Sequence, residues 1–278
     1  YGFNNPDNVC DYEKHQLIAL GDSFTQGFCV RAEDNFVALI REKLPRTINL
    51  GVGSNGPLAS LAVLREYLPD SSVENVLYNY YENDLVKDLP RELNDSLLRR
   101  YLDSSVFSQK LKSNQGEVDD LLIAVHKSEF SYLQSSISIK NEKIWNRLRY
   151  SAKRVFFLSN LREAMGLVFG ESVFPRGETL AIFREMRELV KSNGGKLWFV
   201  YLPHVREIGL SEENNSVRRE ILSIMEELDV PVIDLLPTFM QLDEPLSNWP
   251  FKRPGHFNEL GYRRVARQIL IRLGIEKD

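Results

Sequence analysis

Short apolar segments rich in β-branched and aromatic residues alternate with segments of helical periodicity along much of this chain. The segments with strand character are residues 17–20, 47–50, 75–80, 196–202 and 230–234. The helical segments are residues 34–44, 57–68, 178–192, 212–228 and 259–273. Because this alternation is typical of βαβ units, it predicts a five-stranded parallel sheet with helices on both faces, which is a three-layer α/β/α sandwich.

The interval between the third and fourth predicted strands, residues 85–177, is too long for a simple crossover connection. Its pattern predicts mainly helices, at residues 91–102, 117–126 and 145–169. A segment that leaves the carboxyl end of a parallel strand starts at the edge where open α/β sheets bind ligands. We therefore expect one domain over residues 1–278, with residues 85–177 as a helical insertion over that edge.

Polar residues directly follow the first predicted strand, in the sequence "GDSFTQG" that begins at Gly21. Gly21 allows a sharp turn at the end of the strand, which places Ser23 at the start of the next element. Asp22 and Ser23 are residue types that cap helices, and this motif taken alone favours a capping role. A serine at this point is also a candidate nucleophile, provided that a base accepts its proton and N–H groups stabilise the oxyanion that follows.

Three further motifs supply the groups that such a nucleophile requires. The loop after the second strand reads "NLGVGSNGP" and can expose backbone N–H groups, and "YYENDL" places Asn83 and Asp84 after the third strand. The sequence "PGHFNELGY" places His256 just before the final helix. Because the carboxyl ends of parallel strands meet at one edge, these groups converge there and predict acyl transfer. Asp22 and Asp84 are expected to form hydrogen bonds in the turns rather than to act as catalytic acids.

These four motifs, in this order, resemble the signature blocks of the GDSL, or SGNH, hydrolase superfamily. The resemblance runs from about residue 17 to the final helix and leaves the insertion outside it. It implies a flavodoxin-like α/β fold and a serine esterase in which Ser23 is the nucleophile and His256 is the base. It also implies an oxyanion hole made by the backbone N–H groups of Ser23 and Ser54 and by the side chain of Asn83. Ser54 stands where the family usually has glycine, so its role requires a backbone conformation that serine can adopt.

The acid of the family pattern is missing from its usual place. Where the family has an aspartate two or three residues before the histidine, this chain has Arg253 and Pro254. Three alternatives remain open: Asp243 or Glu244 folds back to reach His256, a backbone carbonyl holds the ring, or the site is degenerate. Asp243 is the predicted third member of the catalytic set.

The resemblance implies hydrolysis of an O-acyl ester through an acyl-enzyme, on a small molecule or on a glycan ester such as an O-acetylated glycan. One alternative is a polysaccharide O-acetyltransferase of the same fold. The other is a non-catalytic glycan-binding or assembly module with a degenerate triad. His204, after the fourth strand, is a weaker candidate for substrate contact. No cofactor is expected, and four histidines without HExxH or CxxC spacing predict no metal site.

Charge and hydropathy restrict the partners of the chain. The formal net charge of −4 provides no overall basic field, so nucleic acid is not an expected partner. No apolar run approaches the ~20 residues that a membrane-spanning helix needs. Basic and aromatic residues alternate between residues 143 and 157, where a helix packed on the core is favoured over contact with a membrane surface.

The N-terminal region bears on the cellular compartment. The chain begins at Tyr1 rather than methionine, which suggests that a signal peptide or anchor is missing from it. Cys10 and Cys29 flank the first strand and could be two separate thiols or a disulfide, and a disulfide would require an oxidising compartment. We expect an extracytoplasmic protein, either periplasmic or secreted.

Overall fold

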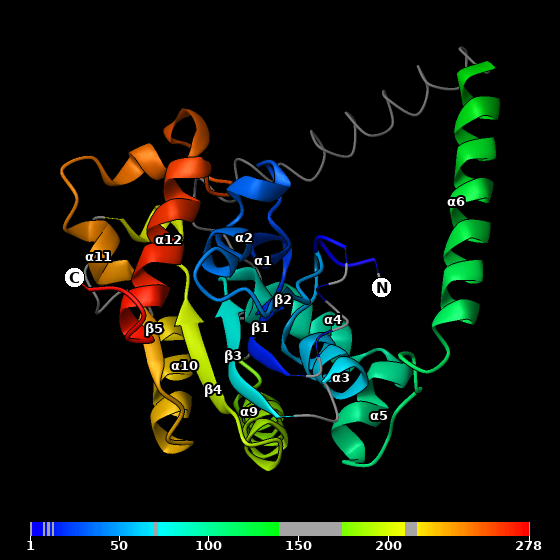
Figure 1. Cartoon of the computed structure of the whole chain (residues 1–278), viewed down its shortest axis with the longest axis horizontal. Coiled ribbons are helices and arrows are strands. Elements are labelled where there is room, and N and C mark those ends of the chain that lie inside the picture. The colour runs from blue at the N-terminus through cyan, green and yellow to red at the C-terminus, as the bar shows by residue number, and fades with distance from the viewer. Residues whose placement is uncertain are drawn as a thin grey trace. The chain divides into compact units, whose positions relative to one another are not determined.

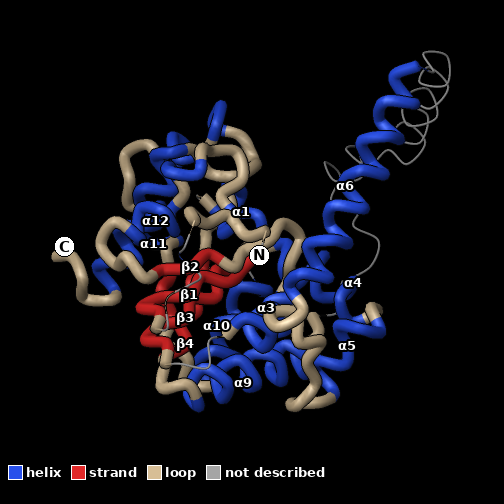
Figure 2. The backbone as a smooth tube through the Cα atoms, turned by 45° about the vertical axis from the view of Figure 1, so that its right-hand side comes forward, coloured by secondary structure: helices blue, strands red, loops and turns tan. Residues whose placement is uncertain are grey.

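Five parallel strands form a single sheet in the order β2-β1-β3-β4-β5. Figure 2 shows the part from β2 to β4. The computed structural model describes residues 2–7, 9, 12, 14–68, 72–138, 174–208 and 216–277. The strands are β1 (His15–Gly21), β2 (Thr47–Asn49), β3 (Val73–Tyr80), β4 (Lys196–Tyr201) and β5 (Val232–Asp234). This confirms the predicted parallel sheet. Since β2 and β3 lie on opposite sides of β1, the chain changes direction between β1 and β3, and ligands bind at such a point in open α/β sheets.

Helices cover both faces of the sheet, as predicted (Figure 1). One face packs against α3 (Pro57–Tyr67), α9 (Arg176–Ser192) and α10 (Ser216–Glu227). The other packs against α2 (Phe36–Arg41), α11 (Leu236–Met240) and α12 (Glu259–Arg272). The three-layer α/β/α sandwich is therefore confirmed.

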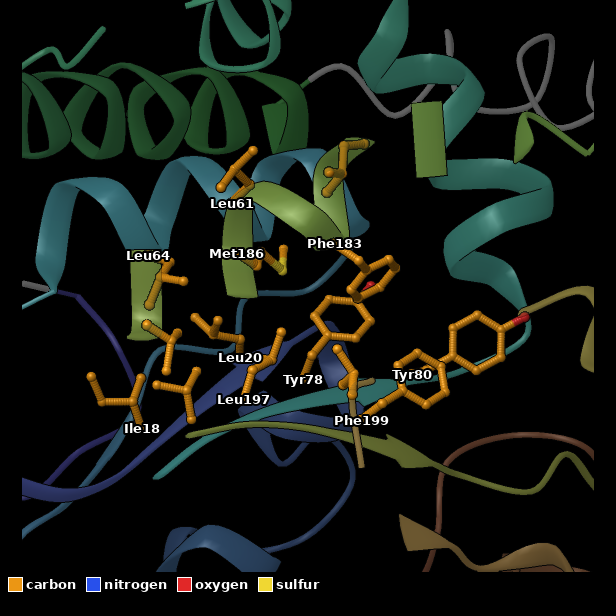
Figure 3. Close-up of a cluster of buried hydrophobic side chains, with 14 of the residues drawn as sticks. Ile18, Leu20, Leu61, Leu64, Tyr78, Tyr80, Phe183, Met186, Leu197 and Phe199 are labelled. Atoms are coloured by element: carbon orange, nitrogen blue, oxygen red, sulfur yellow. The ribbon is translucent and has the colours of Figure 1, made fainter. Parts of the chain in front are cut away.

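The strands are apolar on both sides because helices cover both faces of the sheet. Along β1, Ile18 and Leu20 belong to one buried cluster, whereas Leu17 and Ala19 belong to the other, as the two-residue period of a strand requires. Figure 3 shows the first cluster, in which side chains of α3 and α9 pack on those of the sheet. Full burial of each large apolar side chain contributes about 2 kcal/mol to stability.

The segment after β3 contributes to two compact units. Its first part is a π-helix (Asp84–Asp88), α4 (Leu89–Leu93) and α5 (Ser96–Asp103), which belong to the unit that contains the sheet. In the second unit, the structure describes α6 (Gln115–Ser138), which includes the predicted helix at residues 117–126. The predicted helix at residues 145–169 and the basic and aromatic segment 143–157 lie outside the described residues. Within the described ranges, every helix is too short or too polar to cross a bilayer.

Helix boundaries differ from prediction where a side chain caps the backbone. The predicted helix at residues 34–44 is in fact a 3₁₀ turn (Ala32–Asp34) followed by α2. Asn35 between them is extended, and its side chain accepts a hydrogen bond from the Val37 N–H at 2.6 Å, which starts α2 afresh. Periodicity does not reveal such a cap.

Gly21 ends β1 in a conformation that residues with a Cβ rarely adopt, with a φ of 142°. A Cβ at this position would lie 2.7 Å from the carbonyl oxygen of Asn79 on β3. We expect Gly21→Ala to lower the free energy of unfolding by about 3 kcal/mol, because backbone strain adds to this overlap. Gly194→Ala is the matched control, since Gly194 has a φ of 77° but its Cβ would meet nothing closer than 3.9 Å. For Gly194→Ala we expect the free energy of unfolding to fall by about 1 kcal/mol. Urea denaturation measures the free energy of unfolding of both variants, and equal losses would contradict a steric overlap at Gly21.

Candidate active site

Ser23 is the first residue of the four-residue helix α1 (Ser23–Gln26), directly after the turn at Gly21. Asp22 is the N-cap of this helix, and its Oδ1 accepts a hydrogen bond from the Phe24 N–H at 2.9 Å. Gly27 ends the helix in the left-handed conformation, with a φ of 89°. Asp22 therefore fulfils the capping role, and its Oδ2 also accepts a long hydrogen bond from the Ser23 hydroxyl, at 3.4 Å.

His256 lies beside Ser23, and the distance from Ser23 Oγ to His256 Nε2 is 2.7 Å. The imidazole also contacts two aromatic rings, with centroid distances of 4.6 Å to Phe24 and 5.3 Å to Phe28. Partial burial lowers the pKa of His256 below its ordinary value. The ring is therefore neutral at pH 7 and can accept the Ser23 proton.

Asn258 fixes the loop that carries His256. Its Oδ1 accepts a hydrogen bond from the Gly261 N–H at 3.0 Å and so caps α12. Its Nδ2 donates to the Ser247 carbonyl at 2.8 Å, and its backbone N–H donates to the Asn248 carbonyl at 3.0 Å. The "HFN" part of the motif thus joins the base to the start of a helix, which keeps the imidazole in place.

The glycine-rich loop after β2 passes next to Ser23. A Cβ built on Gly53 would lie 3.8 Å from the Ser23 Cβ, and the Gly53 N–H donates to Gln26 Oε1 at 2.9 Å. Ser54 adopts the left-handed conformation with a φ of 69°, which glycine reaches at lower cost. Within the described part of the chain, the N–H groups of Ser23 and Ser54 donate to no protein acceptor. Both are therefore free of acceptors among the described residues, and their role in an oxyanion hole stays a prediction.

The Asn83 amide bridges two carboxylates. Its Nδ2 donates to Asp88 Oδ2 at 2.5 Å and to Asp22 Oδ2 at 3.3 Å. Asp88 pairs with Arg91 at 3.3 Å, and the Arg91 guanidinium donates to the Ser54 carbonyl at 2.5 Å. The π-helix brings Asp88 back to Asn83, five residues earlier. This network connects Asn83 and Ser54, which are both predicted oxyanion donors. To donate a hydrogen bond to a substrate, Asn83 must release its longer bond, which is the one to Asp22.

The structure does not bring either predicted acid to His256. Glu244 pairs with Lys252 at 3.2 Å. Among the described residues, Asp243 makes no hydrogen bond or ion pair with His256, so its role stays a prediction. The atom beside His256 Nδ1 is instead Sγ of Cys29, at 3.8 Å. The Cys29 thiol is free, so the alternative of a disulfide with Cys10 is not formed in this structure, and Cys10 itself lies outside the described residues.

Four carboxylates are buried close to these groups: Asp22, Asp84, Asp88 and Glu92. Asp84 accepts hydrogen bonds from the Tyr78 hydroxyl at 2.8 Å and from a backbone N–H, which confirms that it bonds within the turn. Burial raises the pKa values of Asp22, Asp84 and Glu92. Among the described residues, no group of three or more His, Cys, Asp or Glu side chains is arranged to hold a metal ion.

The sequence does not reveal the contacts that Glu92 and Cys29 make at the site. Glu92 accepts hydrogen bonds from the N–H groups of Gly56 at 2.5 Å and Leu58 at 3.0 Å, so it caps α3 and fixes the end of the glycine-rich loop. For Cys29 the sequence predicts either a separate thiol or a disulfide, and neither alternative includes a contact with His256. Glu92 follows the loop by more than 30 residues, and no spacing in the sequence signals either contact.

His204 lies at the same edge of the sheet but outside the pair formed by Ser23 and His256. Its Nδ1 is 3.1 Å from Glu82 Oε2, and its ring packs against Tyr81 with a centroid distance of 5.6 Å. Tyr81 in turn packs on Phe24 at 4.0 Å, so two aromatic rings separate the two histidines. A contact between His204 and substrate stays a prediction.

The buried Asp22 carboxyl predicts a pH-dependent stability. Burial raises its pKa to about 6, so the folded chain holds this proton more tightly than the unfolded chain does. Its stabilising contribution is complete below about pH 4 and is lost as the pH rises through 6. We expect the unfolding free energy of the native chain, relative to that of Asp22→Asn, to fall by roughly 3 kcal/mol from pH 4 to pH 7. Urea titrations measure this difference, and a constant value across this range would contradict it.

Comparisons with known proteins bear on the fold. No family model matches the chain, and no curated protein matches its sequence. Among solved structures, LAE5, an alpha/beta hydrolase enzyme from the metagenome of Lake Arreo, Spain, has 12% identity and a TM-score of 0.50 over 95% of this chain and 96% of its own. The acetyl xylan esterase AlAXEase has 13% identity and a TM-score of 0.48, over 94% and 99% of the two chains. A lipase/acylhydrolase from Enterococcus faecalis has 14% identity and a TM-score of 0.48, over 93% of this chain and 95% of its own. At such identities the likeness to LAE5 extends to the fold alone.

Proposed function

We propose that this chain is a serine esterase of the SGNH hydrolase type. The observation that carries the proposal is the 2.7 Å contact between Ser23 Oγ and His256 Nε2. A hydroxyl becomes an effective nucleophile when a base accepts its proton, and the lowered pKa of His256 keeps that base neutral. The N–H groups of Ser23 and Ser54, which donate to no acceptor within the described residues, are the proposed oxyanion donors, and one such donor is worth about 10² to 10³ in rate.

The reaction follows from these positions. The Ser23 hydroxyl gives its proton to His256 Nε2 as Oγ bonds to the ester carbonyl carbon. The N–H groups of Ser23 and Ser54, joined by the Asn83 amide, stabilise the negative charge on the carbonyl oxygen. The bond to the alcohol then breaks, and the alcohol takes the proton from His256. Water next gives a proton to His256 and attacks the acyl carbon, which releases the acid and returns the proton to Ser23.

The substrate we propose is an O-acyl ester, with an O-acetylated glycan as the favoured class. Two exposed aromatic side chains support a glycan: Phe28, which is 57% exposed beside His256, and Phe251, which is 93% exposed in the loop before it. Exposed rings of this kind offer an apolar face to the C–H groups of a sugar.

The test is labelling with a fluorophosphonate followed by intact-mass measurement and peptide mapping. The expected result is one adduct, on Ser23, formed more slowly when an acetyl ester competes. Release of acetate from acetylated oligosaccharides then tests the glycan class, and transfer of acetyl groups to added glycans would identify an acetyltransferase instead. A folded chain that forms no adduct would contradict the esterase and favour the non-catalytic glycan-binding module.

A further inference from the structure

Among the described residues, no carboxylate makes a hydrogen bond with His256, whereas an acid normally orients the histidine of a catalytic triad. In a serine–histidine–acid set, the acid accepts the Nδ1–H of the imidazole, which leaves the Nε2 lone pair facing the serine. Here burial is the cause of the lowered pKa of His256, and no charged group among the described residues contributes to that shift. Another group must therefore hold Nδ1 if His256 is to keep the tautomer that accepts a proton from Ser23.

Cys29 occupies the position beside Nδ1, with its Sγ at 3.8 Å. Its backbone has a φ of 72°, a left-handed conformation that is uncommon for residues other than glycine. The preceding residue, Phe28, is tied at both ends: its N–H donates to the Ser23 carbonyl at 3.0 Å, and its carbonyl accepts from the Tyr262 hydroxyl of α12 at 3.2 Å. These bonds hold the backbone next to Cys29 against α1, which carries Ser23, and against α12, which follows His256.

We propose that Cys29 is the positioning residue of His256, with its thiol sulfur accepting the Nδ1–H so that Nε2 faces Ser23. The catalytic consequence rests on the proposed function, whereas the contact itself does not. A sulfur is a weak acceptor. A thiol that keeps its proton orients the imidazole as a carboxylate does, but it adds no charge to stabilise the imidazolium formed during acyl transfer. The structure thus predicts a correctly oriented but moderately active base.

Substitutions at Cys29 separate orientation from charge. Cys29→Ala removes the acceptor but keeps a Cβ, so the strain of the left-handed backbone is unchanged. Cys29→Ser keeps a polar acceptor on a shorter side chain. Cys29→Asp supplies the charge that the thiol lacks, and aspartate tolerates a positive φ. An opposite charge at this distance raises a histidine pKa by about 1 to 2 units.

The test is NMR of the histidine ring nitrogens in reduced protein, together with the rate of fluorophosphonate labelling. In the native chain we expect His256 to carry its proton on Nδ1, and in Cys29→Ala we expect the Nε2–H tautomer to appear and labelling to slow about tenfold. Cys29→Asp is expected to restore the Nδ1–H tautomer, raise the pKa of His256 and label about tenfold faster than the native chain. His204 is the internal reference, because Cys29 does not contact it.

Two results would overturn the role of Cys29. One is an unchanged His256 tautomer and labelling rate in folded Cys29→Ala and Cys29→Ser, which would assign Nδ1 to a backbone carbonyl or to water. The other is a greater loss in Asp243→Asn than in Cys29→Ala, which would assign the role to Asp243. If the native chain forms no adduct, the proposed function fails, but the ring-nitrogen shifts still decide whether Cys29 holds His256.

Discussion

Ser23→Ala is expected to lower kcat for a short acyl ester by about 10⁵, because the variant has no atom that can attack the carbonyl carbon. The backbone N–H of residue 23 stays in place, so an oxyanion can still be stabilised and some hydrolysis above the rate in water should persist. KM should change little, since the hydroxyl contributes more to the transition state than to binding of the ester. Steady-state kinetics with p-nitrophenyl acetate measures both constants.

The matched control for this substitution is Ser60→Ala. Ser60 is a buried residue of α3, and its Oγ has no hydrogen-bond partner within the described chain. Removing that oxygen should leave kcat within about twofold of the native value, because it touches no group of the site. Comparable losses in the two variants would indicate that Ser23→Ala acts through the fold, and the proposal of a nucleophile would fail.

The sequence predicts the sheet and the serine–histidine pair well because local patterns determine both. Strand and helix periodicity follows from burial on two faces, and the turn at Gly21 follows from the backbone that only glycine adopts there without strain. The convergence of Ser23 and His256 follows from parallel topology, which brings the ends of distant strands to one edge.

The rest of the site depends on contacts that have no local signature. Asp88 reaches Asn83 only because the chain forms a π-helix after β3, and Glu92 caps a helix that begins 35 residues earlier. Cys29 reaches His256 through a left-handed backbone conformation that its residue type does not favour. Such contacts depend on the packing of whole elements, which a spacing rule between motifs does not capture.

The network around Asn83 couples the proposed oxyanion site to buried charge. Asn83 shares its amide between Asp22 and Asp88, and Asp88 reaches the Ser54 carbonyl through Arg91. Protonation of Asp22, whose pKa is raised to about 6 by burial, weakens its hold on the Asn83 amide. One N–H of Asn83 is then more readily available to a substrate oxygen. The oxyanion site is therefore best regarded as an adjustable set of donors.

His256→Ala is the second substitution with a large expected effect, a fall in kcat of about 10⁴. Among the described residues, Ser23 Oγ then keeps only the longer contact with Asp22 Oδ2, at 3.4 Å, in place of the 2.7 Å contact with His256 Nε2. Fluorophosphonate labelling of Ser23 should slow to a similar extent, since phosphonylation requires the same proton transfer. His204→Ala is the control, because His204 is a buried histidine whose Nδ1 accepts a hydrogen bond from the Arg206 N–H and which, within the described residues, makes no hydrogen bond with Ser23. A similar fall in both variants would contradict the assignment of His256 as the base.

The pH dependence of kcat/KM provides an independent check on His256. Only the neutral imidazole accepts a proton, so activity is lost as the pH falls through the His256 pKa, which burial places below the ordinary value of about 6.5. The native chain should therefore keep its activity down to about pH 6.5 and lose it below. Burial raises the pKa of Asp22 to about 6, so Asp22 also titrates on the acid side of neutrality, and the profile of Asp22→Asn is needed to separate the two groups. If the acid limb persists unchanged in Asp22→Asn and disappears from the residual activity of His256→Ala, it belongs to His256. An acid limb that survives in His256→Ala would assign the titration to another group.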